Sequence, residues 1–240
     1  MPVTPELIVA ALIAVAYPIW DYVWGWPRML RTIRSGCQNP RLPVYWEVMG
    51  QLWFMTLVIA GLWVLAGRPW SAQGLVLPTG WRLGVTAALA LVFLTLDALR
   101  TRAIARLDSE KLRRVRVSDA AMVAFAPHTR AEYAWFQPVA VTAGICEELV
   151  YRGFLVWAFQ PWLTLWGAVL VSLVSFAFAH AYQGRQGVVS AGAIGAIFAA
   201  LAILTGSILP GMVLHTLTDL LGAKTSYVIF RDPGAGDTLA

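Results

Sequence analysis

The chain has 240 residues, of which 59% are hydrophobic and only 13% are charged. Soluble domains carry roughly 25% charged residues, so this composition excludes an ordinary soluble protein and indicates a polytopic membrane protein. Lysine and arginine (18) outnumber the acidic residues (13), but they lie in loops between apolar runs. Basic residues in such loops indicate which side of the membrane each loop lies on, and they do not indicate a nucleic-acid-binding surface. The sequence predicts an all-α bundle of transmembrane helices.

Three apolar runs in the first half of the chain predict three transmembrane helices, over residues 5 to 24, 45 to 66 and 82 to 99. The first run has no basic residue before it, so we interpret it as a retained helix and not as a secretory signal peptide. The loop at 25–44 holds four arginines and no acidic residue, which is typical of a cytoplasmic loop. The link at 67–80 holds a single arginine, and we expect it outside.

A basic segment at 100–132 follows the third run. It contains eight lysines and arginines against four acidic residues, so we expect it on the cytoplasmic side. Its first part alternates charged residues with apolar ones and could form an amphipathic helix at the membrane surface. The apolar residues of that part are Ile104, Leu107, Leu112 and Val115. We group residues 1–133 as an N-terminal region.

The second half of the chain predicts four more apolar segments, over 134–159, 162–182, 188–205 and 208–223. These form the membrane core, 134–223, and we expect an unstructured tail at 224–240. The total is about seven transmembrane helices. Alternating loop charge then puts the N-terminus outside and the C-terminus in the cytoplasm. The short chain and its basic cytoplasmic loops favour a bacterial inner membrane.

Two adjacent carboxylates and an arginine interrupt the fourth segment. Charged groups in such a setting cost several kcal/mol unless they are paired or face a wet cavity (roughly 2.5–3.5 kcal/mol on insertion scales). On a helix Glu148 and Arg152 share a face and suit an ion pair, whereas Glu147 points about 100° away. An unpaired buried carboxylate is the kind of group that serves as a general base or acid near neutral pH. Alternatively, all three side chains only make polar contacts that hold neighbouring helices together and take no part in catalysis.

Two of the three histidines also lie in apolar segments, His180 at the end of the fifth and His215 in the last. Asp219 follows His215 by four residues and could orient its ring. Together these groups supply what peptide hydrolysis needs, an activated water and a stabilised oxyanion. Cys146 is a weaker candidate nucleophile, because no histidine lies near it in the sequence.

In chain order, Glu147-Glu148-x-x-x-Arg152, Phe176-x-x-x-His180 and His215-x-x-x-Asp219 resemble the CPBP family. This family comprises CAAX prenyl endoproteases and bacteriocin-processing enzymes and is also called Abi. The resemblance covers roughly residues 135 to 223. Its third motif ends here in Asp, a variant of bacterial-type members, where the prenyl-protein proteases have Asn.

The resemblance implies a role for each motif residue. Glu147 with His180 would position and deprotonate the attacking water, Glu148 and Arg152 would hold the site together, and His215 with Asp219 would stabilise the oxyanion. The same residue types leave a zinc alternative open, with Glu147, His180 and His215 as ligands and water in the open position. We favour metal-free catalysis by glutamate, because no ligand spacing in the sequence demands zinc.

We therefore predict an intramembrane endopeptidase, with its site inside the C-terminal helices. It would cleave a protein or peptide substrate at or near the cytoplasmic membrane face, in contact with membrane lipids and without nucleic acid. The competing hypotheses are a non-proteolytic scaffold or immunity protein and a proton-coupled carrier, since carboxylates and histidines also build proton relays. Against a carrier, the sequence shows no pair of related broken segments. Against a scaffold stands the complete motif set, because a protein that only binds has no chemical need for Glu147.

Overall fold

The computed structural model describes residues 4–104, 106 and 124–231, and every regular element among them is helical. The first five elements follow one another without a break and form one N-terminal helix. The elements are α1 (Pro5–Ala11), η1 (Leu12–Ala16), α2 (Tyr17–Trp20), η2 (Asp21–Gly25), α3 (Trp26–Ile33), α4 (Leu42–Leu65), η3 (Trp70–Gln73), α5 (Trp81–Ile104), α8 (Arg130–Glu147), η4 (Glu148–Leu155), α9 (Val156–Ala179), η5 (Ala181–Gln183), α10 (Gly184–Thr205) and α11 (Leu209–Phe230).

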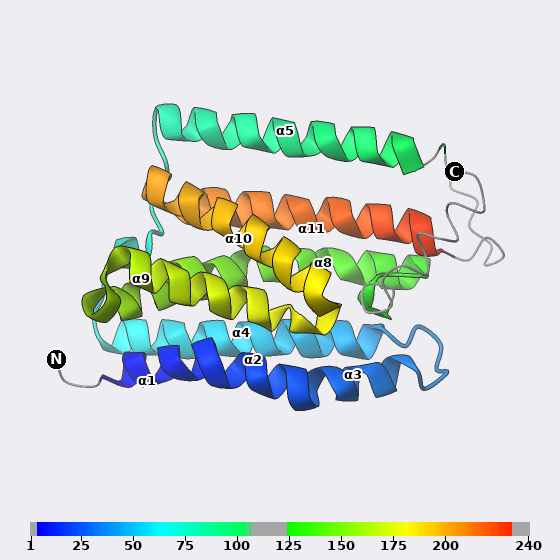
Figure 1. The fold of residues 1–240 in the computed structure, drawn as a ribbon, viewed down its shortest axis with the longest axis horizontal. Coiled ribbons are helices and arrows are strands. Elements are labelled where there is room, and N and C mark those ends of the chain that lie inside the picture. Colours follow the sequence, from blue (N-terminus) through cyan, green and yellow to red (C-terminus); the bar gives the residue numbers. More distant parts are fainter. Residues whose placement is uncertain (1–3, 105, 107–123, 232–240) are drawn as a thin grey trace.

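The long helices run nearly parallel to one axis, and the chain reverses at the two ends of the bundle (Figure 1). The N-terminal helix and α4 form one side of the bundle, and α5 forms the opposite side, where it contacts α11. Between them α8 packs against both α4 and α11, while η4 packs against α9. This arrangement puts the carboxylate motif, at the α8–η4 junction, in the interior.

Five helical stretches among the described residues are long and apolar enough to cross a membrane. One of them, Arg130–Ala179, has 50 residues, far more than the roughly 20 that one crossing needs. It contains a sharp break at Thr164, where φ is 60°, and the chain turns back on itself at this end of the bundle (Figure 1). The all-α membrane fold is confirmed, and the count of about seven crossings stays a prediction.

Several helix ends differ from the predicted ones. The first helix continues to Ile33, and α8 begins at Arg130, because Thr129 and Glu132 form a capping box there. At the C-terminus α11 extends to Phe230 instead of ending at 223, so the predicted tail is helical over its first part. Aromatic stacking explains the extension, since Tyr227 stacks on Tyr133 of α8 with ring centroids 4.9 Å apart. The predicted amphipathic residues Leu107, Leu112 and Val115 lie outside the described residues.

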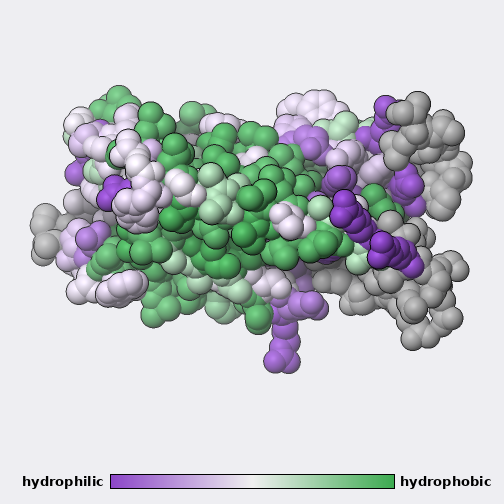
Figure 2. Space-filling model, turned by 90° about the horizontal axis from the view of Figure 1, so that it is seen from above, coloured by the Kyte–Doolittle hydropathy of each residue, from purple (hydrophilic) through white to green (hydrophobic). Residues whose placement is uncertain are grey.

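Apolar side chains cover the middle of the bundle surface, and hydrophilic ones gather toward its ends (Figure 2). Many large apolar residues are exposed, among them Phe54, Leu65 and Trp166. Lipid tails can solvate these side chains, so an apolar exterior costs little in a membrane. The same surface on a soluble protein would be an aggregation site.

A buried ion pair joins the N-terminal region to the core at the end of the bundle that holds the 34–41 loop. Glu132 has no exposed surface, and its carboxylate lies 3.4 Å from the Arg41 guanidinium. It also accepts hydrogen bonds from the backbone N–H groups of His128 and Thr129. Arg41 in turn donates to the carbonyl oxygen of Ala124 at 2.7 Å. One carboxylate therefore caps α8 and fixes the loop before α4.

We expect Glu132→Ala to destabilise the protein by about 3 kcal/mol, because it removes the buried carboxylate that pairs with Arg41 and the α8 cap. Thermal unfolding of the purified protein in detergent, followed by tryptophan fluorescence, measures the change. Arg28→Gln is the matched control, since Arg28 pairs with Glu47 but its side chain is 53% exposed, and such pairs contribute at most about 1 kcal/mol. Equal unfolding temperatures for both variants would contradict the assignment.

Candidate active site

The two adjacent glutamates lie where α8 passes into a π-helical segment. Glu147 is the last residue of α8 and Glu148 the first of η4. π-helical turns are rare and occur frequently at functional sites. The two side chains diverge as the sequence predicted: Glu148 is fully buried among protein groups, and Glu147 lies on the wall of a cavity.

Glu148 links three helical segments through one oxygen atom. Its Oε1 lies 3.0 Å from Nη1 of Arg152 and accepts a hydrogen bond, also at 3.0 Å, from Nδ1 of His215 on α11. Arg152 donates from Nη2 to the carbonyl oxygen of Gly195 on α10 at 3.1 Å. The predicted Glu148–Arg152 pair is therefore present, and it also holds His215 and α10 in place.

Small and aromatic residues make room for this network. A Cβ atom at Gly211 would lie 2.7 Å from Oε2 of Glu148, so only glycine leaves space for the carboxylate beside α11. The Arg152 guanidinium lies 4.1 Å from the ring centroid of Phe176, a cation–π contact that stabilises the charge away from water. Phe198 stacks on the His215 ring at 5.2 Å. The first residue of the second motif thus supports the first motif.

His180 ends α9 and has a defined proton position. Its Nδ1 lies 2.8 Å from the carbonyl oxygen of Phe176, and a carbonyl can only accept, so Nδ1 carries a proton. In the neutral ring Nε2 is then unprotonated and can accept a proton or a hydrogen bond. His180 lines the same cavity as Glu147 and His215.

The expected pairing of His215 with Asp219 differs in the structure. Asp219 Oδ2 lies 3.7 Å from Nε2 of His215 and Glu147 Oε2 lies 3.8 Å from it, beyond hydrogen-bond distance. Glu148 orients the ring instead, because it occupies Nδ1. Nε2 therefore faces two carboxylates without being bonded to either. Asp219 is more open, with a side chain 33% exposed.

The cavity has a volume of about 500 Å³, within the range of small-ligand pockets. Residues of the N-terminal helix, α4, α5, α8, η4 and α11 surround it. Its ionisable and polar wall residues are Tyr17, Asp21, Gln51, Asp97, Arg100, Glu147, Tyr151, His180, Tyr182, Gln183, His215, Thr218, Asp219 and Ser226. Four of the six motif residues line the cavity: Glu147, His180, His215 and Asp219. The other two, Glu148 and Arg152, form a buried ion pair and do not line it.

Glu147, His180 and His215, the ligands of the zinc alternative, all line the cavity. Within residues 4–104, 106 and 124–231, no group of three or more His, Cys, Asp or Glu side chains is arranged to hold a metal ion. Cys146, the weaker candidate nucleophile, is fully buried and does not line the cavity.

Sequence reasoning missed the contribution of the N-terminal helix. Tyr17 and Asp21 line the cavity opposite the motif helices, although their segment reads only as an apolar span. Asp21 carried a signal, because an acidic residue within an apolar run suggests a functional role. The role of the Gly195 carbonyl had no sequence signal.

The matched family agrees with this geometry. Residues 129–221 match a family model described as type II CAAX prenyl endopeptidase Rce1-like. This segment is therefore similar to the CAAX proteases of the CPBP family. No curated protein and no solved structure matches the chain.

The CPBP match spans α8, η4, α9, α10 and more than half of α11, and it contains all six motif residues. Members of this family are membrane CAAX-type endopeptidases, so the chain carries a protease core of that general kind. Together with the apolar helices, the match identifies an integral membrane protein. The N-terminal helix, α4 and α5, which complete the cavity, lie outside the matched CPBP segment.

Proposed function

We propose that this chain is an intramembrane endopeptidase that hydrolyses a peptide bond of a protein or peptide substrate at or near the cytoplasmic membrane face. One observation carries the proposal: Glu147, His180 and His215, from three segments of the CPBP core, line one cavity. Behind them the buried Glu148–Arg152 pair fixes the wall. Glu147 as the general base, His180 as the group that orients the water and His215 as the hydrogen-bond donor to the oxyanion therefore line one cavity.

Glu147 and His180 would activate the attacking water. Oε2 of Glu147 has no hydrogen-bond partner among the described residues, and the unprotonated Nε2 of His180 is free to accept. A water held between the two would donate one proton to the Glu147 carboxylate as its oxygen attacks the scissile carbonyl carbon. The pair supplies both the base and the orientation of the nucleophile.

His215 would stabilise the oxyanion that forms. Nδ1–H donates to Glu148, and a second proton on Nε2 would donate to the negative oxygen of the tetrahedral intermediate. The Glu148 carboxylate at Nδ1 and the Asp219 carboxylate, which lies 3.7 Å from Nε2, would balance the charge of a doubly protonated ring. Collapse of the intermediate then breaks the C–N bond. Glu147 returns its proton to the leaving nitrogen, giving one carboxylate and one amine product.

The site is proposed to work without a metal. The proposal rests on the sequence, in which no ligand spacing demands zinc. Glu147 then acts as the base itself and not as a ligand.

The proposed location is a bacterial inner membrane, with the N-terminus outside and the C-terminus in the cytoplasm. The arginine-rich loop before α4 lies at the end of the bundle where α5 and α11 also end (Figure 1), and basic residues favour the cytoplasmic side. Arg100 and Pro127, which line the cavity, lie near the end of α5 and just before the start of α8, and so at the same end. This supports substrate entry from the cytoplasmic side.

The test combines peptide cleavage with metal analysis. We expect the purified wild-type protein to cleave members of a peptide library in the presence of a chelator and to contain no stoichiometric zinc by mass spectrometry. Zinc present in wild type but lost in His180→Ala, together with inhibition by the chelator, would overturn the metal-free mechanism. Failure to cleave any peptide, by folded protein in detergent and in liposomes, would favour the scaffold, immunity or carrier alternatives.

A further inference from the structure

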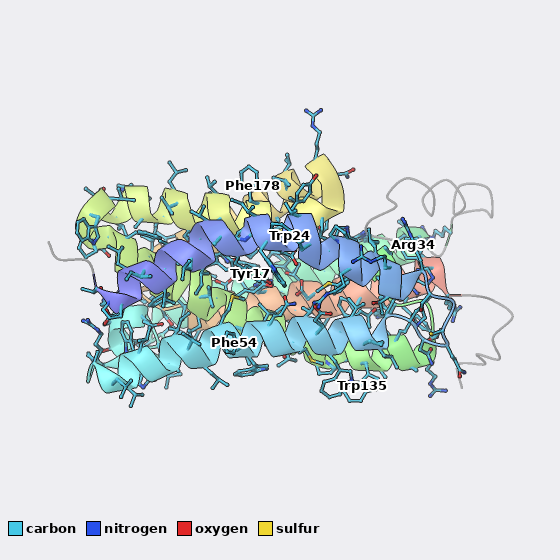
Figure 3. The ribbon with its side chains drawn as sticks, turned by 90° about the horizontal axis from the view of Figure 1, so that it is seen from below. Tyr17, Trp24, Arg34, Phe54, Trp135 and Phe178 are labelled. Carbon is cyan, nitrogen blue, oxygen red and sulfur yellow. The ribbon has the colours of Figure 1, made fainter. Side chains whose placement is uncertain are left out.

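Asp21 is an ionisable group inside the membrane region that the proposed mechanism does not use. It begins η2, a π-helical segment of the N-terminal helix, and it lines the cavity together with Glu147 and His215. Tyr17, four residues earlier, lies between this helix and α4 (Figure 3) and lines the cavity as well. The N-terminal helix therefore presents a polar face to the catalytic residues from the opposite wall.

The carboxylate of Asp21 has no hydrogen bond or ion pair within the part of the chain that the structure describes. Neighbouring carboxylates are engaged: Glu47 of α4 contacts Arg28 and accepts a hydrogen bond from Gln51, and Asp97 of α5 accepts one from Thr225. Keeping an unpaired carboxylate at membrane depth is costly. A cationic partner from outside the protein would offset this cost.

The local backbone leaves the Asp21 carboxylate free to reach such a partner. A Cβ atom at Gly25, one turn later, would lie 2.6 Å from Oδ1 of Asp21, so glycine at this position lets the carboxylate adopt its place beside the helix. The Tyr17 hydroxyl donates a hydrogen bond to Oε1 of Gln51 at 3.3 Å and makes no hydrogen bond to Asp21. The carboxylate remains accessible from the cavity.

We propose that Asp21 forms a substrate subsite that binds a cationic group, a lysine or arginine side chain close to the scissile peptide bond. This inference rests on the proposed endopeptidase function and specifies its substrate class. Asp21 supplies a charge-assisted hydrogen bond to the cation, which selects substrates with a basic residue at one fixed position relative to the cleaved bond. Because Asp21 lies outside the matched CPBP segment, it gives this chain a preference separate from the shared catalytic residues.

The test uses short fluorescent peptides of one apolar sequence in which a single lysine, or norleucine as its neutral counterpart, is moved through each position. For wild type we expect lysine at one position to raise kcat/KM about tenfold or more over norleucine. Asp21→Asn should lower the ratio of kcat/KM for lysine over norleucine peptides to about one, and Asp21→Lys should reverse the preference toward glutamate at the same position. Glu47→Gln is the matched control, since Glu47 does not line the cavity, and it should keep the lysine preference.

Binding is measured in parallel by fluorescence anisotropy, so that failure of this inference and failure of the proposed function are distinguished. Tighter binding of lysine peptides to wild type than to Asp21→Asn supports the subsite even if no peptide is cleaved. Equal binding and cleavage of the lysine and norleucine series by wild type would overturn the inference while leaving the protease intact. If Glu47→Gln loses the lysine preference to the same extent as Asp21→Asn, the inference is overturned as well. The preference would then come from the overall negative charge of the protein and not from a contact with Asp21.

Discussion

Glu147→Gln is expected to lower the cleavage rate by about 10³-fold or more while leaving the fold intact. The amide keeps the size of the carboxylate but cannot take a proton from water, and general base catalysis typically contributes 10²–10⁴-fold. Little structural cost is expected, because Oε2 of Glu147 has no hydrogen-bond partner among the described residues to lose. Steady-state cleavage of the best library peptide, with the unfolding temperature recorded alongside, measures both effects.

Glu47→Gln serves as the control for this result, since it neutralises a carboxylate that does not line the cavity. Its cleavage rate should stay within about twofold of wild type, as expected for a surface substitution. A Glu147→Gln protein that cleaves at the wild-type rate would exclude Glu147 as the base. The proposed mechanism would then be wrong, although the similarity of the segment to the CPBP family would stand.

Arg152→Leu is expected to produce the largest loss of stability, about 3–5 kcal/mol, because it leaves Glu148 buried without its cation. Arg152 is only 6% exposed and Glu148 is not exposed at all, so water cannot compensate. We expect a strongly lowered unfolding temperature and a smaller folded fraction after purification. Arg34→Leu, in the exposed loop before α4, should change neither.

A double variant separates the pair from general damage to the core. If the uncompensated charge causes the loss, Arg152→Leu combined with Glu148→Gln should be more stable than Arg152→Leu alone. Additive losses would show that packing of the Arg152 side chain against Phe176, and not its charge, holds this wall together.

The sequence predicted contacts between residues of one helix from their spacing, but it did not predict contacts between different helices. The i,i+4 relation of Glu148 and Arg152 predicted their ion pair, and the apolar runs predicted the helical membrane fold. The same spacing rule named Asp219 as the partner of His215, but a residue 67 positions away, Glu148, makes the hydrogen bond. Such a contact depends on how α8 and α11 pack, which a helical period does not encode.

The close approach of those two helices also lacked a signal of its own. At Gly144 a Cβ atom would overlap the backbone and side chain of Thr216 on α11. In a membrane such small residues let helix backbones meet. Gly144 lies one turn before Glu148, so this contact brings the carboxylate within reach of His215. Only the three-dimensional packing shows that the glycine preceding the motif helps to build the site.

The contacts of Glu148 Oε1 hold one wall of the cavity in place, whereas the opposite wall is held less tightly. Through it η4, α11 and α10 are tied together by groups buried from solvent, so these segments are expected to move as one body. The opposite wall has looser ties: α5 has no buried residue and makes its main contacts with α11. A substrate entering from the side would therefore displace α5 and leave the reacting groups in register.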